Sequence, residues 1–318
     1  DADILEEIAR IYGYDNIPSS DLEGNATAGV KTDKQKFEDK VKKNATAIGL
    51  NEILTYSFVS PKGVDKINLP QDDEKRDFVK IINPLGEETS VMRTTLIPNM
   101  LDVISTNLSH KVEEVGAFEC GNTFKPQEGL PVQMKNLCIG MYGKEVDFFV
   151  LKGAVEAIVN NVGLRGYEIE PETTNLTFHP GRCAKLMYNN ICLGTFGELH
   201  PDVLENYSLN QRVYVAELNL DLVFENLNHV ITYNPLPKYP ATTRDIALLV
   251  KDEVFVKQIE DIIKANGEDI LESYQLFDVY KGAQIEEGHK SIAYSITYRS
   301  KEKTLTDEDV AKVHDKIV

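Results

Sequence analysis

A proline-rich break divides this chain into two segments with different patterns. Three prolines fall within the eight residues of Tyr233–Pro240. Proline lacks an amide hydrogen and fixes its own φ angle, so such a run ends helices and interrupts sheets. The chain has 318 residues, and a single domain usually has roughly 100–200. We therefore predict at least two domains, with a boundary near residue 231.

The segment before the break predicts a mixed, mainly antiparallel sheet with helices on one face. Short apolar runs outnumber helical patterns and come in adjacent pairs. Strands are expected at about 52–58, 78–82, 114–119, 135–142, 166–170, 184–189, 191–197 and 212–219. Helices are expected at about 1–18 (with a closing turn), 33–48, 95–109 and 148–162. The buried face of the second helix is expected to contain Phe37, Val41, Ala45 and Ile48. Gly49 then follows as its C-cap.

The segment after the break has the order strand, helix, strand, strand, helix. These elements are expected at about 244–251, 254–266, 270–280, 290–299 and 306–318. The order is one strand short of a ferredoxin-like βαββαβ unit, so we expect the last strand beyond Val318. Because side chains alternate along a strand, one set is expected to face the helices: Ile292, Tyr294, Ile296 and Tyr298. The opposite, open face is expected to contain Asp245, Asp278, Tyr280 and Arg299.

Composition limits the classes of protein that this chain can represent. Its net charge of −17 argues against a broad nucleic-acid surface, so any RNA contact must be local. There is no apolar run of the ~18 residues that a membrane helix needs, nor a signal peptide. The cysteines are widely spaced and suggest buried free thiols in a reducing cytoplasm rather than a zinc or disulfide site: Cys120, Cys138, Cys183 and Cys192. The histidines have no metal-ligand spacing either.

Several phrases, in order along the chain, resemble one family. They are Asp3–Pro18, Leu54–Pro61, Ile82–Leu96, His179–Arg182, Gly197–Pro201, Tyr239–Ala247, Leu276–Gly282, Tyr298–Ser300 and Thr304–Thr306. Together they are similar to the C-terminal half of the β subunit of bacterial-type phenylalanyl-tRNA synthetases. One phrase would be weak evidence, but this many in the family's order are specific.

The resemblance implies a domain plan and partners. Residues 1–18 would end a B5 domain, 19–32 would form a linker, 33–230 a class II catalytic-like core, and 231–318 a ferredoxin-fold anticodon-binding domain. The family assembles in the cytoplasm as α2β2 with a catalytic α subunit that uses ATP, and it binds phenylalanine tRNA. The chain begins at Asp1, inside a helical pattern, so we expect it to be a fragment of a longer protein. It is shorter than the family pattern between Tyr142 and Asp147, where the usual tryptophan is absent.

No catalytic residue is predicted in this chain. A class II ligase uses arginines on its central sheet to stabilise charge on the α-phosphate. The matching stretches Val115–Phe124 and Gly194–His200 contain no arginine. The core is therefore expected to be a structural relative of the active site that supports the α subunit. Ser57, Ser90 and Ser105 lack the context of a nucleophile elbow.

An acidic group near the start is a candidate Mg²⁺ site. Asp3, Glu6 and Glu7 lie three or four residues apart and can share one helix face, as hard cations require. The resemblance implies that this Asp-x2-Glu-Glu pattern holds a magnesium ion between the β and α subunits, with a further Asp upstream of residue 1. The alternative is a solvated first turn whose acids favour the helix dipole.

The open face of the second domain is the candidate tRNA surface. Residues 233–318 contain 12 Lys+Arg and 16 Asp+Glu, a net charge of −4, against −13 for the rest. Open sheet faces with aromatic and cationic side chains receive single-stranded bases in RRM-like folds. The residues expected to contact the anticodon region are Tyr280, Lys281, Arg299 and Lys301. Arg299 could instead join Asp245 and Asp278 in a structural ion network.

Two other functions fit parts of this pattern. The ferredoxin-like domain could be a small-ligand sensor in a regulatory module, because fold alone does not fix function. The core could also be a self-sufficient class II ligase. The favoured hypothesis is a non-catalytic subunit portion that supports the α subunit and binds the anticodon region.

Overall fold

The structure is a computed structural model that describes residues 1–318 except 22, 25–27, 228–232, 234 and 283. The chain divides into two compact units, Asp1–Val230 and Ile231–Val318. The first unit contains two hydrophobic cores and the second unit contains one. No helix in the described part is both long and apolar enough to span a bilayer.

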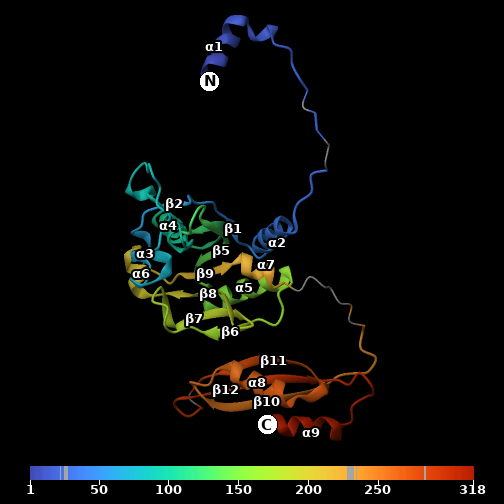
Figure 1. The fold of residues 1–318 in the computed structure, drawn as a ribbon. Coiled ribbons are helices and arrows are strands. Elements are labelled where there is room, and N and C mark those ends of the chain that lie inside the picture. The colour runs from blue at the N-terminus through green and yellow to red at the C-terminus, as the bar shows by residue number, and fades with distance from the viewer. Residues whose placement is uncertain (22, 25–27, 228–232, 234, 283) are drawn as a thin grey trace. The chain divides into compact units, whose positions relative to one another are not determined.

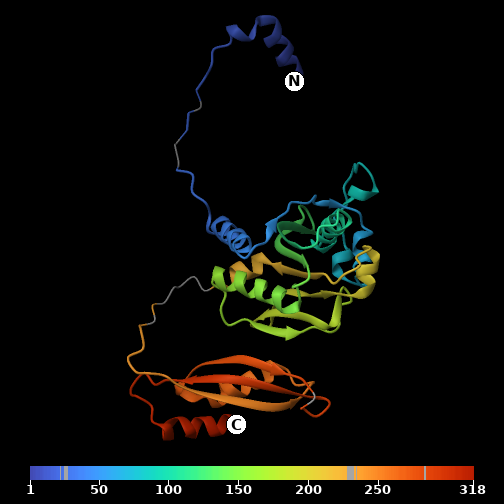
Figure 2. The same ribbon diagram turned by 180° about the vertical axis from the view of Figure 1, so that it is seen from behind.

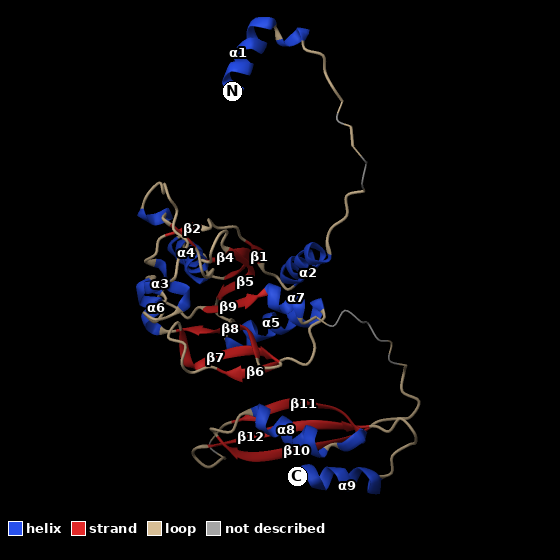
Figure 3. Ribbon diagram, viewed as in Figure 1, coloured by secondary structure: helices blue, strands red, loops and turns tan. Residues whose placement is uncertain are grey.

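The first unit is built on a seven-stranded sheet in the order β1-β4-β5-β9-β8-β7-β6 (Figure 3). Its strands are β1 Asn51–Glu52, β4 Val115–Lys125, β5 Val132–Tyr142, β6 Glu168–Pro171, β7 Phe178–Tyr188, β8 Ile191–Leu199 and β9 Tyr214–Asn219. Only the β1–β4 pair is parallel among these described strands. A separate antiparallel pair joins β2 Phe58–Val59 to β3 Val91–Met92. The mainly antiparallel sheet matches the prediction.

Helices cover both faces of this sheet, so the prediction of helices on one face is wrong. The helices are α1 Ala2–Tyr12, α2 Asp33–Ala47, α3 Gly63–Lys66, α4 Ile97–Ser109, α5 Phe148–Val162, α6 Pro201–Asn206 and α7 Leu220–Glu225. Short 3₁₀ turns lie at Tyr14–Asn16, Glu74–Arg76 and Glu87–Thr89. One core packs α2, α5 and α7 on the sheet, and the other packs α4 and α6 on it (Figures 1 and 2). The reason is visible in β4, where the neighbours Ala117 and Phe118 point to opposite faces and are both buried.

Helix α2 begins and ends for local reasons. Thr32 and Gln35 form a reciprocal capping box at its start. Its predicted face buries three of the four expected residues, but Ile48 lies beyond the helix and is 39% exposed. Gly49 turns the chain at φ 93°, a positive value that residues other than glycine rarely adopt, and Leu50 after this turn is buried instead.

Two predicted strands are largely wrong. The predicted strand 52–58 is extended in a sheet only at its two ends, and 78–82 contributes a single bridge from Lys80 to Val91. The middle of the first segment is held by a side chain, because the Thr55 hydroxyl donates to Glu119 at 2.7 Å. The helices α3, α6 and α7 were not predicted, since helices of four to six residues show too little periodicity.

The second unit has the predicted order of elements. It comprises β10 Thr242–Lys251, α8 Val256–Asn266, a 3₁₀ turn Glu268–Ile270, β11 Leu271–Tyr280, β12 His289–Tyr298 and α9 Asp307–Ile317. The sheet order is β10-β12-β11, with both pairs antiparallel. The four residues expected to face the helices are fully buried in its core: Ile292, Tyr294, Ile296 and Tyr298. That prediction is confirmed.

Three of the four cysteines are buried as expected, but Cys192 is exposed. Burial raises the pKa of the Cys120 and Cys183 thiols to about 12, so both are inert neutral thiols. His179 and His200 serve as local hydrogen-bonding groups. The His200 ring accepts from the Asp202 amide at the start of α6.

Candidate functional site

A cavity of about 570 Å³ lies on the sheet of the first unit, and we call it the sheet cavity. Its walls come from the segment 67–77, from Thr94 and Thr95, and from strands β4, β5, β7, β8 and β9. These segments are far apart in the sequence and meet only through the sheet topology. The cavity borders Val115–Phe124 and Gly194–His200, the two stretches that the sequence analysis matched to a class II active site.

Every lysine that lines the sheet cavity is already paired with a carboxylate. Lys125 Nζ lies 2.6 Å from Glu74, and Lys75 Nζ lies 3.5 Å from the buried Glu217. Lys185 pairs with Glu172, which is 4% exposed. Burial alone would raise the Glu172 pKa, but hydrogen bonds from Lys185 and Thr174 outweigh it and lower the pKa to about 2.

The charges of the sheet cavity do not suit a triphosphate. The charged residues in its lining are Lys75, Lys125, Lys185, Asp73, Glu74, Asp77, Glu172 and Glu217. Carboxylates outnumber cations by two, and none of the described lining residues is an arginine. Catalysis of phosphoryl chemistry needs cations aimed at the developing charge. That this core has no catalytic residue stays a prediction.

The carboxylate of Glu217 has a structural task instead. It accepts hydrogen bonds from the Thr95 hydroxyl at 2.8 Å and from the Leu96 amide at 2.6 Å. These bonds tie strand β9 to the start of α4. A buried carboxylate that is satisfied in this way fixes the position of the helix rather than binding substrate.

The sequence analysis missed a buried ion pair in the core. Arg93 and Glu119 have side-chain exposures of 3% and 1%, and Arg93 Nη2 lies 2.9 Å from Glu119. Arg93 also donates to the Thr55 hydroxyl at 2.8 Å and to the Asn122 carbonyl at 2.9 Å. The signal in the sequence was an arginine within the otherwise uncharged stretch Val91–Leu96. Each of the three guanidinium nitrogens of Arg93 therefore has a partner inside the protein, so this arginine holds the fold.

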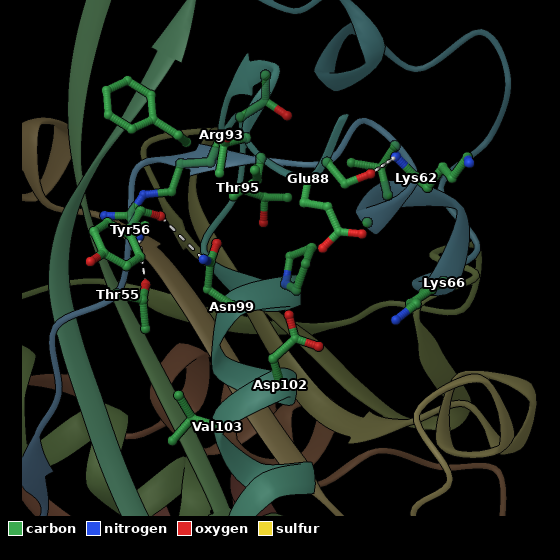
Figure 4. A pocket seen from close by; sticks show the side chains of 18 of the residues that line it. Thr55, Tyr56, Lys62, Lys66, Glu88, Arg93, Thr95, Asn99, Asp102 and Val103 are labelled. Atoms are coloured by element: carbon green, nitrogen blue, oxygen red, sulfur yellow. Dashed lines mark hydrogen bonds between the residues drawn. The ribbon is translucent and has the colours of Figure 1, made fainter. Parts of the chain in front are cut away.

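A second cavity, of about 810 Å³, lies between α4 and the segment 54–66 (Figure 4). We call it the α4 cavity. In Figure 4, Asn99 and Asp102 project into it from α4, and Glu88 extends toward them from the opposite side. Asn99 is oriented by a hydrogen bond from its Nδ2 to the Tyr56 carbonyl, at 3.2 Å. Partial burial raises the pKa of the Asp102 carboxyl group.

Large apolar side chains are exposed near this end of the core. Leu54 is 90% exposed and Tyr56 is 81% exposed, and both line the α4 cavity. Ile82 is 94% exposed and Leu85 is fully exposed. All four lie within the phrases Leu54–Pro61 and Ile82–Leu96. We call these four residues the apolar group. Packing within this chain does not explain why these positions hold large apolar residues, because the side chains point into solvent.

The open face of the second unit carries the predicted residues on β10 and β11. Asp245, Asp278 and Tyr280 pair with Ser295, Ala293 and Ser291, whose side chains alternate with the buried set on β12. Tyr280 is 44% exposed. A bulge between Leu276 and Asp278 adds an exposed aromatic ring at Phe277.

The four predicted tRNA contacts do not form one cluster. Tyr280 pairs with Ser291, eight positions before Arg299, which is roughly 26 Å along an extended strand. Lys281 Nζ lies 2.6 Å from Asp252. Tyr280 and Lys281 therefore lie at one end of the sheet, and Arg299 and Lys301 follow the other end of β12.

Arg299 belongs to an ion network, but with a different partner from the one predicted. Its Nε donates to both Glu272 oxygens at 2.9 Å, and its Nη1 donates to the Tyr239 carbonyl at 2.6 Å. Asp245 and Asp278 are not among these partners. Arg299 thereby anchors the segment that enters β10, while Lys301 is exposed.

The carboxylates on α1 do not form a cation site by themselves. Asp3, Glu6 and Glu7 are all exposed, and Glu7 accepts a hydrogen bond from Arg10 Nε at 3.0 Å. Among the described residues, no group of three or more acidic, histidine or cysteine side chains is arranged to hold a metal. The residues present therefore do not fit a Mg²⁺ ion without further ligands.

Comparison with known proteins gives consistent matches for both units. Residues 17–220 match the model of the phenylalanyl tRNA synthetase beta chain CLM domain, and residues 237–318 match the ferredoxin-fold anticodon binding domain. The chain is 50% identical to the phenylalanine–tRNA ligase beta subunit of Clostridium tetani and 47% identical to that of Clostridium acetobutylicum. Each match covers 99% of this chain and 40% of the relative, so the chain spans two fifths of their length.

A solved structure also shares the fold of the core. The pyrrolysyl-tRNA synthetase from Desulfitobacterium hafniense matches with a TM-score of 0.50 and 14% identity. The match covers 60% of this chain and 68% of that one. At this identity the likeness concerns the fold alone, which is the predicted α+β class II synthetase-like sheet.

Proposed function

This chain belongs to the phenylalanyl-tRNA synthetase β-chain family, and from that premise we propose that it is a non-catalytic part of a phenylalanine–tRNA ligase. The core unit supports the catalytic α subunit in an α2β2 assembly, and the C-terminal unit binds the anticodon region of phenylalanine tRNA in the cytoplasm. ATP and Mg²⁺ serve the reaction of the α subunit. Asp3, Glu6 and Glu7 contribute to a Mg²⁺ site only together with ligands from outside α1.

The apolar group is the observation that carries the scaffold role. Four large apolar side chains, each at least 81% exposed, form two pairs in the sequence, Leu54 with Tyr56 and Ile82 with Leu85. Exposed apolar groups of this kind mark protein interfaces, since burying them in a complex removes their surface from water. The paired lysines of the sheet cavity support the same proposal, because they leave phosphoryl chemistry to a partner.

The test of the scaffold role is complex formation. Light-scattering chromatography of this chain mixed with an α subunit from the same source is expected to give a stable complex. Replacing Ile82 and Leu85 with serine should weaken it, because the complex loses buried apolar surface. The matched control replaces Phe149, which is 72% exposed on α5, with serine. Well-folded chains that fail to associate at micromolar concentration would refute the scaffold role.

Exposed rings on the open face support the tRNA role of the C-terminal unit. Tyr280 and Phe277 offer surfaces on which unpaired bases can stack, and stacking contributes about 1–3 kcal/mol per base. Replacing Tyr280 with alanine is therefore expected to weaken binding of an anticodon stem-loop roughly 5- to 150-fold at fixed salt. The control is Phe255→Ala, because Phe255 is 56% exposed, against 44% for Tyr280, but is the N-cap residue of α8.

The same titration discriminates between the proposed role and the sensor alternative. A chain that ignores the stem-loop but binds a small metabolite would favour a regulatory module. The family match gives that alternative no support. ATP–pyrophosphate exchange by this chain alone would instead indicate a self-sufficient ligase.

A further inference from the structure

We propose that the α4 cavity is the receptor for a single arginine side chain of the catalytic α subunit. The inference rests on the proposed scaffold role and adds the chemistry of one contact to it. Figure 4 shows the cavity from close by. Its occupant is identified by the hydrogen-bonding groups that the cavity leaves unsatisfied.

Two polar atoms at this cavity are buried and have no hydrogen-bond partner. One is the hydroxyl of Tyr207, a residue that is 5% exposed and lines the cavity. The other is Asn99 Oδ1, which is left over because Nδ2 of the same amide donates to Tyr56. A buried polar atom without a partner costs free energy, so each is a position where a ligand atom gains a favourable contact.

The charges of the lining favour a cation. Arg93 is neutralised by Glu119, and Lys62 pairs with Glu87 at 2.8 Å. Lys66 remains, with its Nζ 5.0 Å from the centre of the Tyr207 ring. The lining also contains two carboxylates, Asp102 and Glu88. Lys66 attracts Asp102 electrostatically, but neither carboxylate forms a salt bridge within the described part of the chain. One added positive charge balances the cavity.

Among protein side chains, the guanidinium group matches this demand. Asp102, Asn99 and the Tyr207 oxygen are all able to accept, and an occupant must therefore offer several donors. Arginine has five N–H donors and no acceptor, in a fixed planar arrangement. Its aliphatic stem can lie against the lining residues Tyr56 and Pro98. Lysine offers only three donors at one point, so it satisfies the separate acceptors less well.

The location fits an occupant from a partner chain. Leu54 and Tyr56 of the apolar group belong to the cavity rim, so the cavity is continuous with the surface to which we assign the α subunit. Interfaces commonly combine an exposed apolar area with a pocket that receives one arginine or aromatic anchor.

The test compares three variants in the complex and in the free chain. Asp102→Asn and Tyr207→Phe each remove one attraction for a guanidinium group and keep the shape of the cavity. Each is expected to weaken binding of the α subunit tenfold or more. The matched control is Glu145→Gln, an exposed carboxylate outside the cavity, which should leave the affinity within twofold.

The free chain separates a binding role from a structural one. Because burial disfavours the charged form of Asp102, Asp102→Asn should leave the melting temperature of the free chain unchanged or raise it. Tyr207→Phe removes an unsatisfied hydroxyl, so it too should leave the melting temperature of the free chain unchanged or raise it. Opposite effects on the free chain and on the complex are the expected signature, whereas equal destabilisation of both would overturn the inference.

Chemical modification identifies the occupant. Phenylglyoxal, which modifies arginine, should spare one arginine of the α subunit in the wild-type complex and modify it in the Asp102→Asn complex. Unchanged affinity of both cavity variants, or no protected arginine, would overturn the inference while leaving the scaffold role intact. Failure of the wild-type chain to bind the α subunit would overturn both.

Discussion

The buried pair of Arg93 and Glu119 provides the sharpest test of what holds the core together. We predict that Arg93→Met destabilises the core by about 3–5 kcal/mol, because it leaves a buried carboxylate without its cation. Two further hydrogen bonds, to Thr55 and to the Asn122 carbonyl, are lost in the same change. For a unit of this size, about 2–4 °C per kcal/mol translates this into a melting temperature lower by roughly 6–20 °C.

A double variant separates the charge from the loss of packing. Glu119→Gln keeps a group that can accept from the Thr55 hydroxyl and removes the charge. Adding it to Arg93→Met should therefore recover most of the lost stability. The control is Lys62→Met, whose pair with Glu87 is 70% and 59% exposed and should contribute under about 1 kcal/mol.

Differential scanning calorimetry with far-UV circular dichroism measures these effects. The two units have separate cores, so the transition of the C-terminal unit serves as an internal reference and should not shift. The reasoning is refuted if Arg93→Met costs less than 1 kcal/mol. It is equally refuted if the double variant is no more stable than the single one.

Three further substitutions test other parts of the core. In Gly194→Ala the new Cβ would lie 2.8 Å from the Cα of Leu218 on the neighbouring strand, so we expect a loss of at least about 1–3 kcal/mol by urea unfolding. Gly153→Ala, inside α5 with open space around it, should instead gain about 0.5–1 kcal/mol, and a loss there would contradict the packing argument. Glu172 has a pKa lowered from 4.5 to about 2, because hydrogen bonds, chiefly from Lys185, outweigh its burial. A carboxyl group whose pKa is lowered by folding stabilises the fold at pH values above its unfolded pKa. The loss of stability in Glu172→Gln should therefore be complete at pH 7 and should disappear as pH falls from about 4.5 to about 2. A loss that is independent of pH would contradict this assignment.

Local patterns in the sequence determined a large part of the fold. The alternation along β12 identified its buried face, because a strand places successive side chains on opposite sides and only one side is apolar. Helical spacing and the flanking glycine placed α2, and the prolines of Tyr233–Pro240 marked the change between the two units. The short segments that resemble the family identified it, since they match its local motifs and occur in the same order along the chain.

Only the tertiary structure decided which distant residues meet. Glu217 bonds to Thr95 across 122 positions because β9 lies between β5 and β8 in the sheet, an order that no local pattern encodes. The same topology buries Arg93 against Glu119 and leaves Asn99 and Tyr207 with unsatisfied atoms at one cavity. Periodicity reports which side of a segment is apolar, whereas the partner of a polar side chain depends on how segments are packed together. The sites of this protein are made by such pairings, so their chemistry became visible only in the folded chain.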